Sequence, residues 1–111
     1  MYQDIADIPG LYKYSINDEG NIDRDGTEWC MTPGGGANHY ENPAFADSTF
    51  LYIRVVWENN GDFQWYRITW TDLSAGVVVP GSENKMFYGV DGTLLLCEDG
   101  TAFDVLAWVW Q

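Results

Sequence analysis

The sequence has few basic residues. Lys and Arg together number 5 against 17 Asp and Glu, which gives this 111-residue chain a formal net charge of −12. A chain so acidic repels nucleic acid and anionic membrane surfaces. The expected partners are therefore cations or basic protein surfaces, including a surface that normally holds DNA. The alternative is that the acidity only keeps a small, aromatic-rich protein soluble.

Histidine, cysteine and long apolar runs are also scarce. The one histidine, His39, has no Asp, Ser or Cys at a spacing typical of catalysis, and we interpret it as a polar loop residue. Cys30 and Cys97 are too few for a zinc site or a disulfide framework. Buried thiols are the favoured interpretation, and a single bridge between them is the alternative. No segment has the roughly 18 apolar residues that cross a bilayer, and the N-terminal residues do not resemble a signal peptide. We therefore expect an intracellular protein of the cytoplasm that does not enter a membrane.

Aromatic residues and glycine, in contrast, are abundant. The chain holds six Trp, seven Tyr, five Phe and 12 Gly, a mixture typical of short strands joined by tight turns. The clearest signal lies at residues 49–72, where two aromatic and β-branched runs flank Asn60-Gly61, as in a β-hairpin. We predict a single domain over residues 1–111 with a mostly β fold. Antiparallel hairpins would form a meander in a twisted sheet or open barrel, with at most one short helix.

The turn of this hairpin predicts which residues face each other. With Asn60-Gly61 at the turn, Arg54 lies opposite Arg67, and Tyr52 and Trp65 share their face. Like charges directly opposite destabilise a sheet, so we expect an anion beside the two arginines. An internal carboxylate is the favoured source. The alternative is an exposed anion or ligand site formed by Tyr52, Arg54, Trp65 and Arg67. The other face is assigned to the core because it is nearly all apolar, with Leu51, Ile53, Val55 and Ile68 among its residues.

Outside this hairpin the sequence predicts further short strands and one long loop. Residues 11–16, 21–23 and 28–31 would form a small meander with a turn at 24–27. Residues 32–48 are expected to form a loop of roughly 15 residues. Residues 73–75 are expected to form a single helical turn. Short strands are then expected at residues 77–79 (buried), 85–90, 93–97 and 102–110, the last of them central or well covered.

The densest group of acids lies between residues 18 and 28. Residues 21–26 place oxygen ligands at alternate positions with glycine sixth, as in the first half of a calcium-binding loop. The twelfth position, which needs a bidentate Glu, is Thr32, and Arg24 adds a positive charge. We expect solvated acids in a turn, with no metal and no cofactor; weak calcium binding is the alternative. The acids of this candidate binding patch are Asp18, Glu19, Asp23, Asp25 and Glu28.

Several short segments resemble the small modular DNA-binding domain attached to phage HNH homing endonucleases. They are residues 8–15 (IPGLYKYS), 19–22 (EGNI) and 66–70 (YRITW). The nuclease half of that family is resembled by residues 79–85 (VPGSENK), 90–92 (VDG) and 106–109 (LAWV). The resemblance implies a phage origin and a scaffold that has lost its original activity.

This chain departs from the family where the family's chemistry resides. Tyr88-Gly89 stands in place of the Asn-His before the Asp-Gly, and the downstream Asn pair is absent. Thr69 replaces the His of the second hairpin strand, and residues 20–22 read Gly-Asn-Ile instead of Gly-Arg-Val. The metal-binding and general-base groups that hydrolysis needs are therefore missing, and we expect no enzyme activity.

These features favour a small acidic interaction protein, encoded by a phage, that blocks a basic nucleic-acid-binding surface of a host enzyme. A restriction or CRISPR nuclease or a polymerase would be such an enzyme, and the carboxylates would imitate DNA phosphates. An even scatter of the acids would count against this imitation. One alternative is a degenerate DNA-binding module in which Lys13, Arg54 and Arg67 converge on one face. The other is a phage structural or assembly protein that docks through exposed aromatic residues.

Overall fold

The protein is all-β throughout the part of the chain that the structure, a computed structural model, describes. Backbone is described for residues 10–31 and 38–111, and side chains for residues 13–22 and 38–111. Within these ranges the chain contains no helix, and therefore none long and apolar enough to cross a membrane. The predicted mostly β fold with antiparallel hairpins is confirmed.

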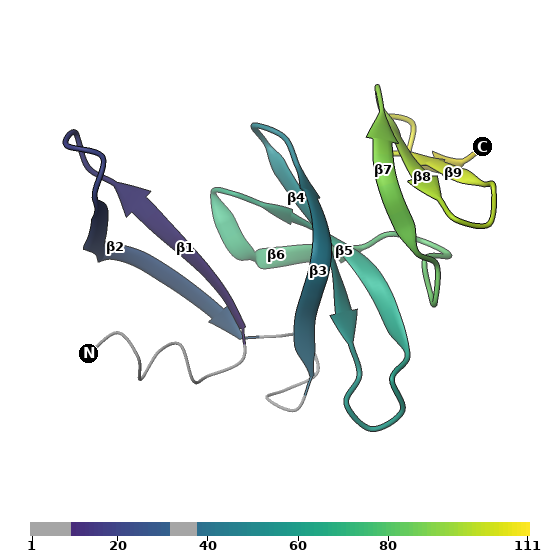
Figure 1. The fold of residues 1–111 in the computed structure, drawn as a ribbon, viewed down its shortest axis with the longest axis horizontal. Coiled ribbons are helices and arrows are strands. Elements are labelled where there is room, and N and C mark those ends of the chain that lie inside the picture. The colour runs from purple at the N-terminus through teal and green to yellow at the C-terminus, as the bar shows by residue number, and fades with distance from the viewer. Residues whose placement is uncertain (1–9, 32–37) are drawn as a thin grey trace.

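The described strands form three antiparallel sheets (Figure 1). A two-stranded hairpin stands on one side of a four-stranded sheet of order β3-β4-β5-β6, and a second four-stranded sheet of order β10-β9-β8-β7 lies on its other side. Neither four-stranded sheet closes into a barrel, since its first and last strands do not pair. The strands are β1 (Gly10–Ile16), β2 (Ile22–Met31), β3 (His39–Ala46), β4 (Phe50–Val56), β5 (Phe63–Thr69), β6 (Asp72–Val78), β7 (Phe87–Asp91), β8 (Leu94–Cys97), β9 (Ala102–Asp104) and β10 (Val109–Trp110).

The first hairpin, formed by β1 and β2, contains a single tight turn. Asn17 Oδ1 accepts the backbone N–H groups of Glu19 and Asn21, both at 3.0 Å, which closes the turn between β1 and β2. The turn predicted at residues 24–27 is wrong, because these residues lie within β2 opposite the single residue Tyr14. The ladder holds on both sides of them, so the extra residues form a bulge and do not reverse the chain.

The central hairpin reverses through a four-residue loop, residues 58–61. Trp57 N–H donates to Asp62 O and Gly61 N–H donates to Trp57 O, both at 2.8 Å. Gly61 has a φ of +77°, in the left-handed region that favours glycine, and is the last residue of the loop. The expected turn with Gly61 near its centre is therefore wrong, and the register of the two strands differs from the predicted register by two residues.

This difference in register changes the partners of the two arginines. Arg54 pairs with Trp65 and Tyr52 pairs with Arg67, so the predicted pairing of Arg54 with Arg67 is wrong. Because side chains alternate along a strand, a shift of two leaves every residue on its predicted face. Both faces are buried: the predicted core face forms a smaller cluster, and the face of Tyr52 and Trp65 forms the main one. The smaller cluster comprises Leu51, Ile53, Ile68 and Leu73.

Neither outer strand of the central sheet was predicted at its observed length: β3 lies wholly within the expected loop, and β6 overlaps the predicted strand 77–79 only at its last two residues. Residues 39–46 of the expected loop form β3, whereas residues 32–37 of that loop lie outside the described residues. An edge strand tolerates Pro43, which lies in a bulge between Glu41 and Ala44. The expected helical turn at residues 73–75 is also wrong, since these residues belong to β6. The expectation of a buried run at 77–79 holds only for Val79, which is fully buried; the two valines before it are exposed.

The C-terminal sheet ends in a hairpin where a single long strand was predicted. The Asp104 carboxylate accepts the N–H groups of Leu106 and Ala107 at 2.9 and 3.1 Å and so closes a turn between β9 and β10. The strand expected over residues 102–110 is therefore wrong. The reversal places the Trp110 ring 5.3 Å from that of Phe103, between centroids.

The main core lies between the two four-stranded sheets and centres on Trp65. Its fully buried ring lies 5.9 Å from Phe45 and 5.0 Å from Phe87, between centroids. Its backbone N–H donates to Oγ of the buried Ser82 at 2.9 Å, and its indole N–H donates to Lys85 O at 2.6 Å. Cys97 is a buried free thiol in the same cluster, and the side chain of Cys30 lies outside the described residues.

Candidate functional site

The predicted arginine face lies between the sheets and is not an open surface. Tyr52 and Trp65 are 4% and 0% exposed, and burial is the main cause that raises the pKa of Tyr52. Arg54 donates through Nη2 to Asn42 O at 2.9 Å and lies 3.6 Å from a Glu41 carboxylate oxygen. An internal carboxylate, the source that the sequence favoured, therefore lies beside Arg54.

Arg67 is held by aromatic rings. Its guanidinium carbon lies 4.3 Å from the ring centroid of Phe50 and 4.1 Å from that of Trp108. It forms no ion pair with the described residues, so the ring faces stabilise its charge. Lys13, the third cation of the DNA-binding alternative, donates to Trp70 O. Each of these three cations is thus engaged within the protein.

His39 lies on β3, not in a loop, and connects β3 to the loop after β4. Its Nε2 is 2.6 Å from Glu41 Oε2, and its Nδ1 is 2.7 Å from Glu58 Oε1. The hydrogen bond to Glu41 is the largest cause that raises the pKa of His39, and partial burial opposes it. Because both ring nitrogens contact carboxylates, His39 acts as a cross-link and offers neither nitrogen as a general base.

The N-terminal acidic patch is described only in part. Asp18 and Glu19 are exposed at the tip of the β1–β2 hairpin, whereas the side chains of Asp23, Asp25 and Glu28 lie outside the described residues. Across the described side chains, no group of three or more His, Cys, Asp or Glu could hold a metal ion.

The carboxylates of the described residues divide by what they contact. Several close turns by accepting backbone N–H groups a few residues ahead. The bond from the Ala107 N–H lowers the pKa of Asp104, and the Ser74 hydroxyl, followed by the Ser74 N–H, lowers that of Asp72. Others neither accept a hydrogen bond nor form an ion pair within the described part of the chain. The turn-closing residues are Asp47, Asp72, Asp99 and Asp104, and the residues without a contact are Asp18, Glu19, Glu83, Asp91 and Glu98.

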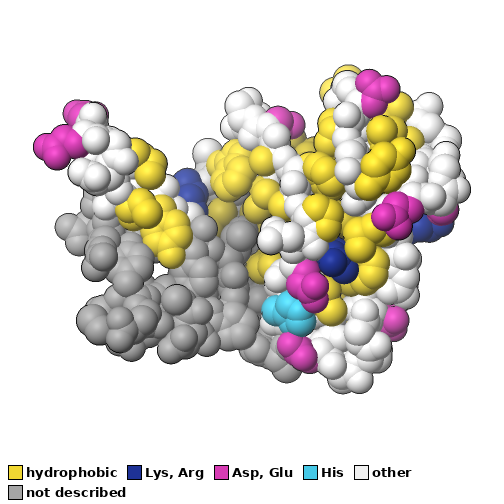
Figure 2. All heavy atoms as spheres, in the orientation of Figure 1, with side chains coloured by type: hydrophobic (Ala, Val, Ile, Leu, Met, Phe, Trp, Pro, Cys, Tyr) yellow, Lys and Arg dark blue, Asp and Glu magenta, His cyan; other side chains and the backbone are white. Residues whose placement is uncertain are grey.

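The acids do not form one stripe on the face that Figure 2 shows. There the described carboxylates are scattered: some adjoin one another at the upper left, others lie beside the histidine or a basic side chain, and apolar and neutral side chains separate these places. This face therefore gives no support to imitation of a DNA strand by a row of phosphate-like charges.

Two hollows meet at Glu83, which lines both. The smaller, of about 240 Å³, lies at the loop end of the β4–β5 hairpin, and the larger, more open one has about 440 Å³. We call the carboxylates around them the acidic ledge: Asp62, Glu83, Glu98 and Asp99. Among the described residues that line the two hollows, Lys85 alone is basic, and its Nζ lies 2.5 Å from Asp99. This contact lowers the pKa of Asp99 and raises that of Lys85.

Asn84 positions the ledge against β5. Its N–H donates to Phe63 O at 2.7 Å, and its side-chain oxygen accepts the Phe63 N–H at 3.1 Å. Its Nδ2 reaches Asp62 Oδ1 at 3.3 Å. Asn84 has a φ of +56°, which asparagine tolerates better than most residues. The residue therefore fixes Glu83, its neighbour, close to Asp62.

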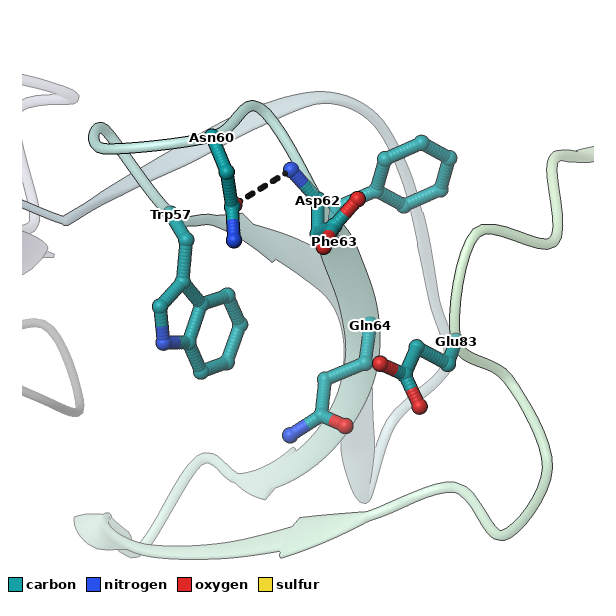
Figure 3. A pocket seen from close by; sticks show the side chains of 6 residues that line it. All are labelled: Trp57, Asn60, Asp62, Phe63, Gln64 and Glu83. Atoms are coloured by element: carbon teal, nitrogen blue, oxygen red, sulfur yellow. Dashed lines mark hydrogen bonds between the residues drawn. The ribbon is translucent and has the colours of Figure 1, made fainter.

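The smaller hollow combines an aromatic ring with acidic and amide groups (Figure 3). The indole of Trp57 lies on one side, and the side chains of Gln64 and Glu83 lie on the other. Asn60, whose side-chain oxygen accepts the Asp62 N–H at 2.9 Å, lies at the hairpin end, and the Phe63 ring points away. The described residues of its lining include two carboxylates and no basic side chain, so this hollow is suited to a cation.

Sequence reasoning did not find this site, because Glu83 comes from the loop after β6 and the other lining residues come from the β4–β5 hairpin. Trp57 and Asp62 close the hairpin loop and could have been noted beside the turn, but no local signal joins them to Glu83. The chain matches no protein-family model, no curated protein and no solved structure.

Proposed function

We propose that this protein is a non-enzymatic binding protein that engages a basic surface of a partner protein. The observation that carries the proposal is the acidic ledge, where Asp62, Glu83 and Glu98 form no ion pair with the described residues. Carboxylates gathered without compensating cations attract a positively charged surface and repel nucleic acid. The net charge of −12 adds long-range attraction that accelerates encounter with such a partner.

The partner we favour is an enzyme that acts on nucleic acid, because such enzymes present basic surfaces. The resemblance to the phage DNA-binding module supports a phage protein that blocks a host nuclease or polymerase. The carboxylates on the face in Figure 2 are scattered and form no continuous row. This favours docking at one discrete place, the ledge, over imitation of a whole DNA strand.

Two variants with the same change in charge test this proposal. The first neutralises the ledge with Asp62→Asn, Glu83→Gln and Glu98→Gln. The matched control neutralises three acids elsewhere with Asp18→Asn, Glu19→Gln and Asp91→Asn. Each tagged protein is used to capture partners from a bacterial lysate, with washes at low and high salt and a final elution with a DNA oligonucleotide. Circular dichroism checks that each variant is folded.

We expect the wild type and the control to retain the same nucleic-acid enzyme at low salt and to release it at high salt. The ledge variant should retain much less of it, and DNA should elute it because both compete for one basic surface. Equal retention by the two triple variants, or retention that salt does not affect, would contradict the proposal.

A further inference from the structure

The smaller hollow has unused hydrogen-bonding capacity. Glu83 has no partner among the described residues, and the Trp57 indole N–H donates to none of them. Gln64 reaches Tyr66 Oη at 3.4 Å through its Nε2, which leaves its carbonyl oxygen available. Asp62 accepts one bond, from Asn84. Most of these groups are acceptors, so the hollow favours a ligand that donates hydrogen bonds.

A guanidinium group fits this set of groups better than an ammonium group does. It is planar and stacks on an aromatic ring while its edge donates several N–H groups in a fixed geometry to carboxylates. Trp57 supplies the ring, and Glu83 and Asp62 supply the carboxylates (Figure 3). The volume of about 240 Å³ is below the range of about 300–1,000 Å³ for pockets that bind drug-sized ligands, so a single side chain is the suitable occupant.

The protein binds its own Arg54 in this way. Arg54 lies over the Phe63 ring, 4.8 Å from its centroid, and contacts the Glu41 carboxylate at 3.6 Å. The smaller hollow presents the same pair of groups, an aromatic ring and a carboxylate, to a side chain from outside.

We propose that this hollow binds an arginine side chain of the partner. The identity of the occupant rests on the proposed function, which supplies a basic partner, but the chemistry of the hollow can be tested with a small molecule. The probe is N-acetylarginine amide. Nα-acetylcitrulline amide has the same length and a planar end group but no charge. Nα-acetyllysine amide has the positive charge but no planar group.

The measurement is the NMR shift of the tryptophan indole N–H signals of the full chain during titration with each probe. The Trp57→Phe variant identifies the signal of Trp57. We expect the arginine probe to shift that signal to saturation and the lysine probe to bind at least about threefold more weakly, because it lacks the stacking plane. The citrulline probe should give no saturable shift.

Single substitutions locate the site. Glu83→Gln should weaken the arginine probe about five- to tenfold, the loss typical of one hydrogen bond at an exposed site. The matched control Glu98→Gln removes the same charge from the other hollow and should change the affinity less than about twofold, because exposed charges without direct contact contribute little. Both residues are exposed, so both variants should fold.

Three results would overturn the inference: no saturable shift of the Trp57 signal, equal binding of the arginine and citrulline probes, or equal effects of Glu83→Gln and Glu98→Gln. If the probe fails while the ledge variant still loses the captured enzyme, only the arginine inference is wrong. If the probe binds while capture does not depend on the ledge, the basic-surface function is wrong and the hollow is a site for a small guanidinium ligand.

Discussion

At the scale of single residues, His39 shows how an isolated titratable group becomes part of the fold. No partner for His39 could be predicted from the sequence, because its two carboxylates come from different places, one on its own strand and one in the loop after β4. Each contact stabilises the protonated imidazole, so the pKa of His39 in the folded protein lies above its ordinary value of 6.5. A group whose pKa rises on folding stabilises the protein below its unfolded pKa, and this contribution is lost as pH rises through the folded pKa.

The His39→Gln substitution should therefore cost more stability in mild acid than in mild base. We expect the loss in unfolding free energy to be larger at about pH 5.5 than at about pH 8.5, by no more than about 1 kcal/mol, since the contacts are partly exposed. Urea unfolding of both proteins at the two pH values measures it. Glu58→Gln, which removes one of the two contacts, should show a smaller difference of the same sign. A loss that does not change with pH would show that His39 contributes only packing.

At the scale of elements, the sequence located strands where turn residues flank aromatic runs. β4, β5, β7 and β8 lie within a few residues of the expected ranges for this reason. The errors share one physical cause, which is that Gly, Pro and Asp serve equally well in turns and in irregular strands. Gly26 and Pro43 lie in bulges within β2 and β3, and Asp72 accepts the N–H of Ser74 without starting a helix.

The acidic ledge was beyond local sequence reasoning for a related reason. Its geometry depends on the left-handed Asn84, which binds the backbone of Phe63 on β5. Such a contact between residues far apart in the sequence leaves no periodic pattern. The charge that makes the ledge useful was, however, evident from composition alone.

The loop that carries Glu83 also receives the C-terminal hairpin, and glycine makes this contact possible. A Cβ on Gly81 would lie 3.0 Å from the Trp110 Nε1, whereas a Cβ on Gly92 would meet nothing within 4 Å. The φ values of Gly81 and Gly92, +72° and +61°, are both left-handed. Gly92→Ala is therefore a matched control, because it strains a left-handed backbone position without bringing the new methyl group against a neighbour.

We expect Gly81→Ala to destabilise the protein more than Gly92→Ala, by about 1–2 kcal/mol beyond the shared cost of the left-handed backbone. The added methyl group displaces the Trp110 indole, which donates to Pro80 O at 2.6 Å and stacks on Phe87 at 5.7 Å between centroids. Urea denaturation of the three proteins measures the difference. Equal losses would mean that the C-terminal hairpin does not depend on this contact.

At the scale of the whole molecule, charge acts on folding and on binding in opposite directions. Only Lys85, Arg54 and His39 form ion pairs with carboxylates in the described part of the chain, so most carboxylates there repel one another without compensation. At about 10 mM salt the Debye length of about 30 Å exceeds the shortest dimension of the molecule, 20 Å. Repulsion then reaches through the thickness of the molecule, whereas at about 150 mM salt it is confined to near neighbours, at about 8 Å.

The midpoint of thermal unfolding should therefore rise by a few degrees between about 10 and 150 mM sodium chloride, because self-repulsion opposes the compact state. The triple variant Asp18→Asn, Glu19→Gln and Asp91→Asn should begin at a higher midpoint and respond less to salt. A midpoint that falls as salt is added would mean that the few ion pairs outweigh the repulsion. Over the same range of salt, capture of a basic partner should weaken. If salt weakens binding and also raises the midpoint of thermal unfolding, the protein is still folded when binding is lost. The loss of binding is then due to screening of the ledge.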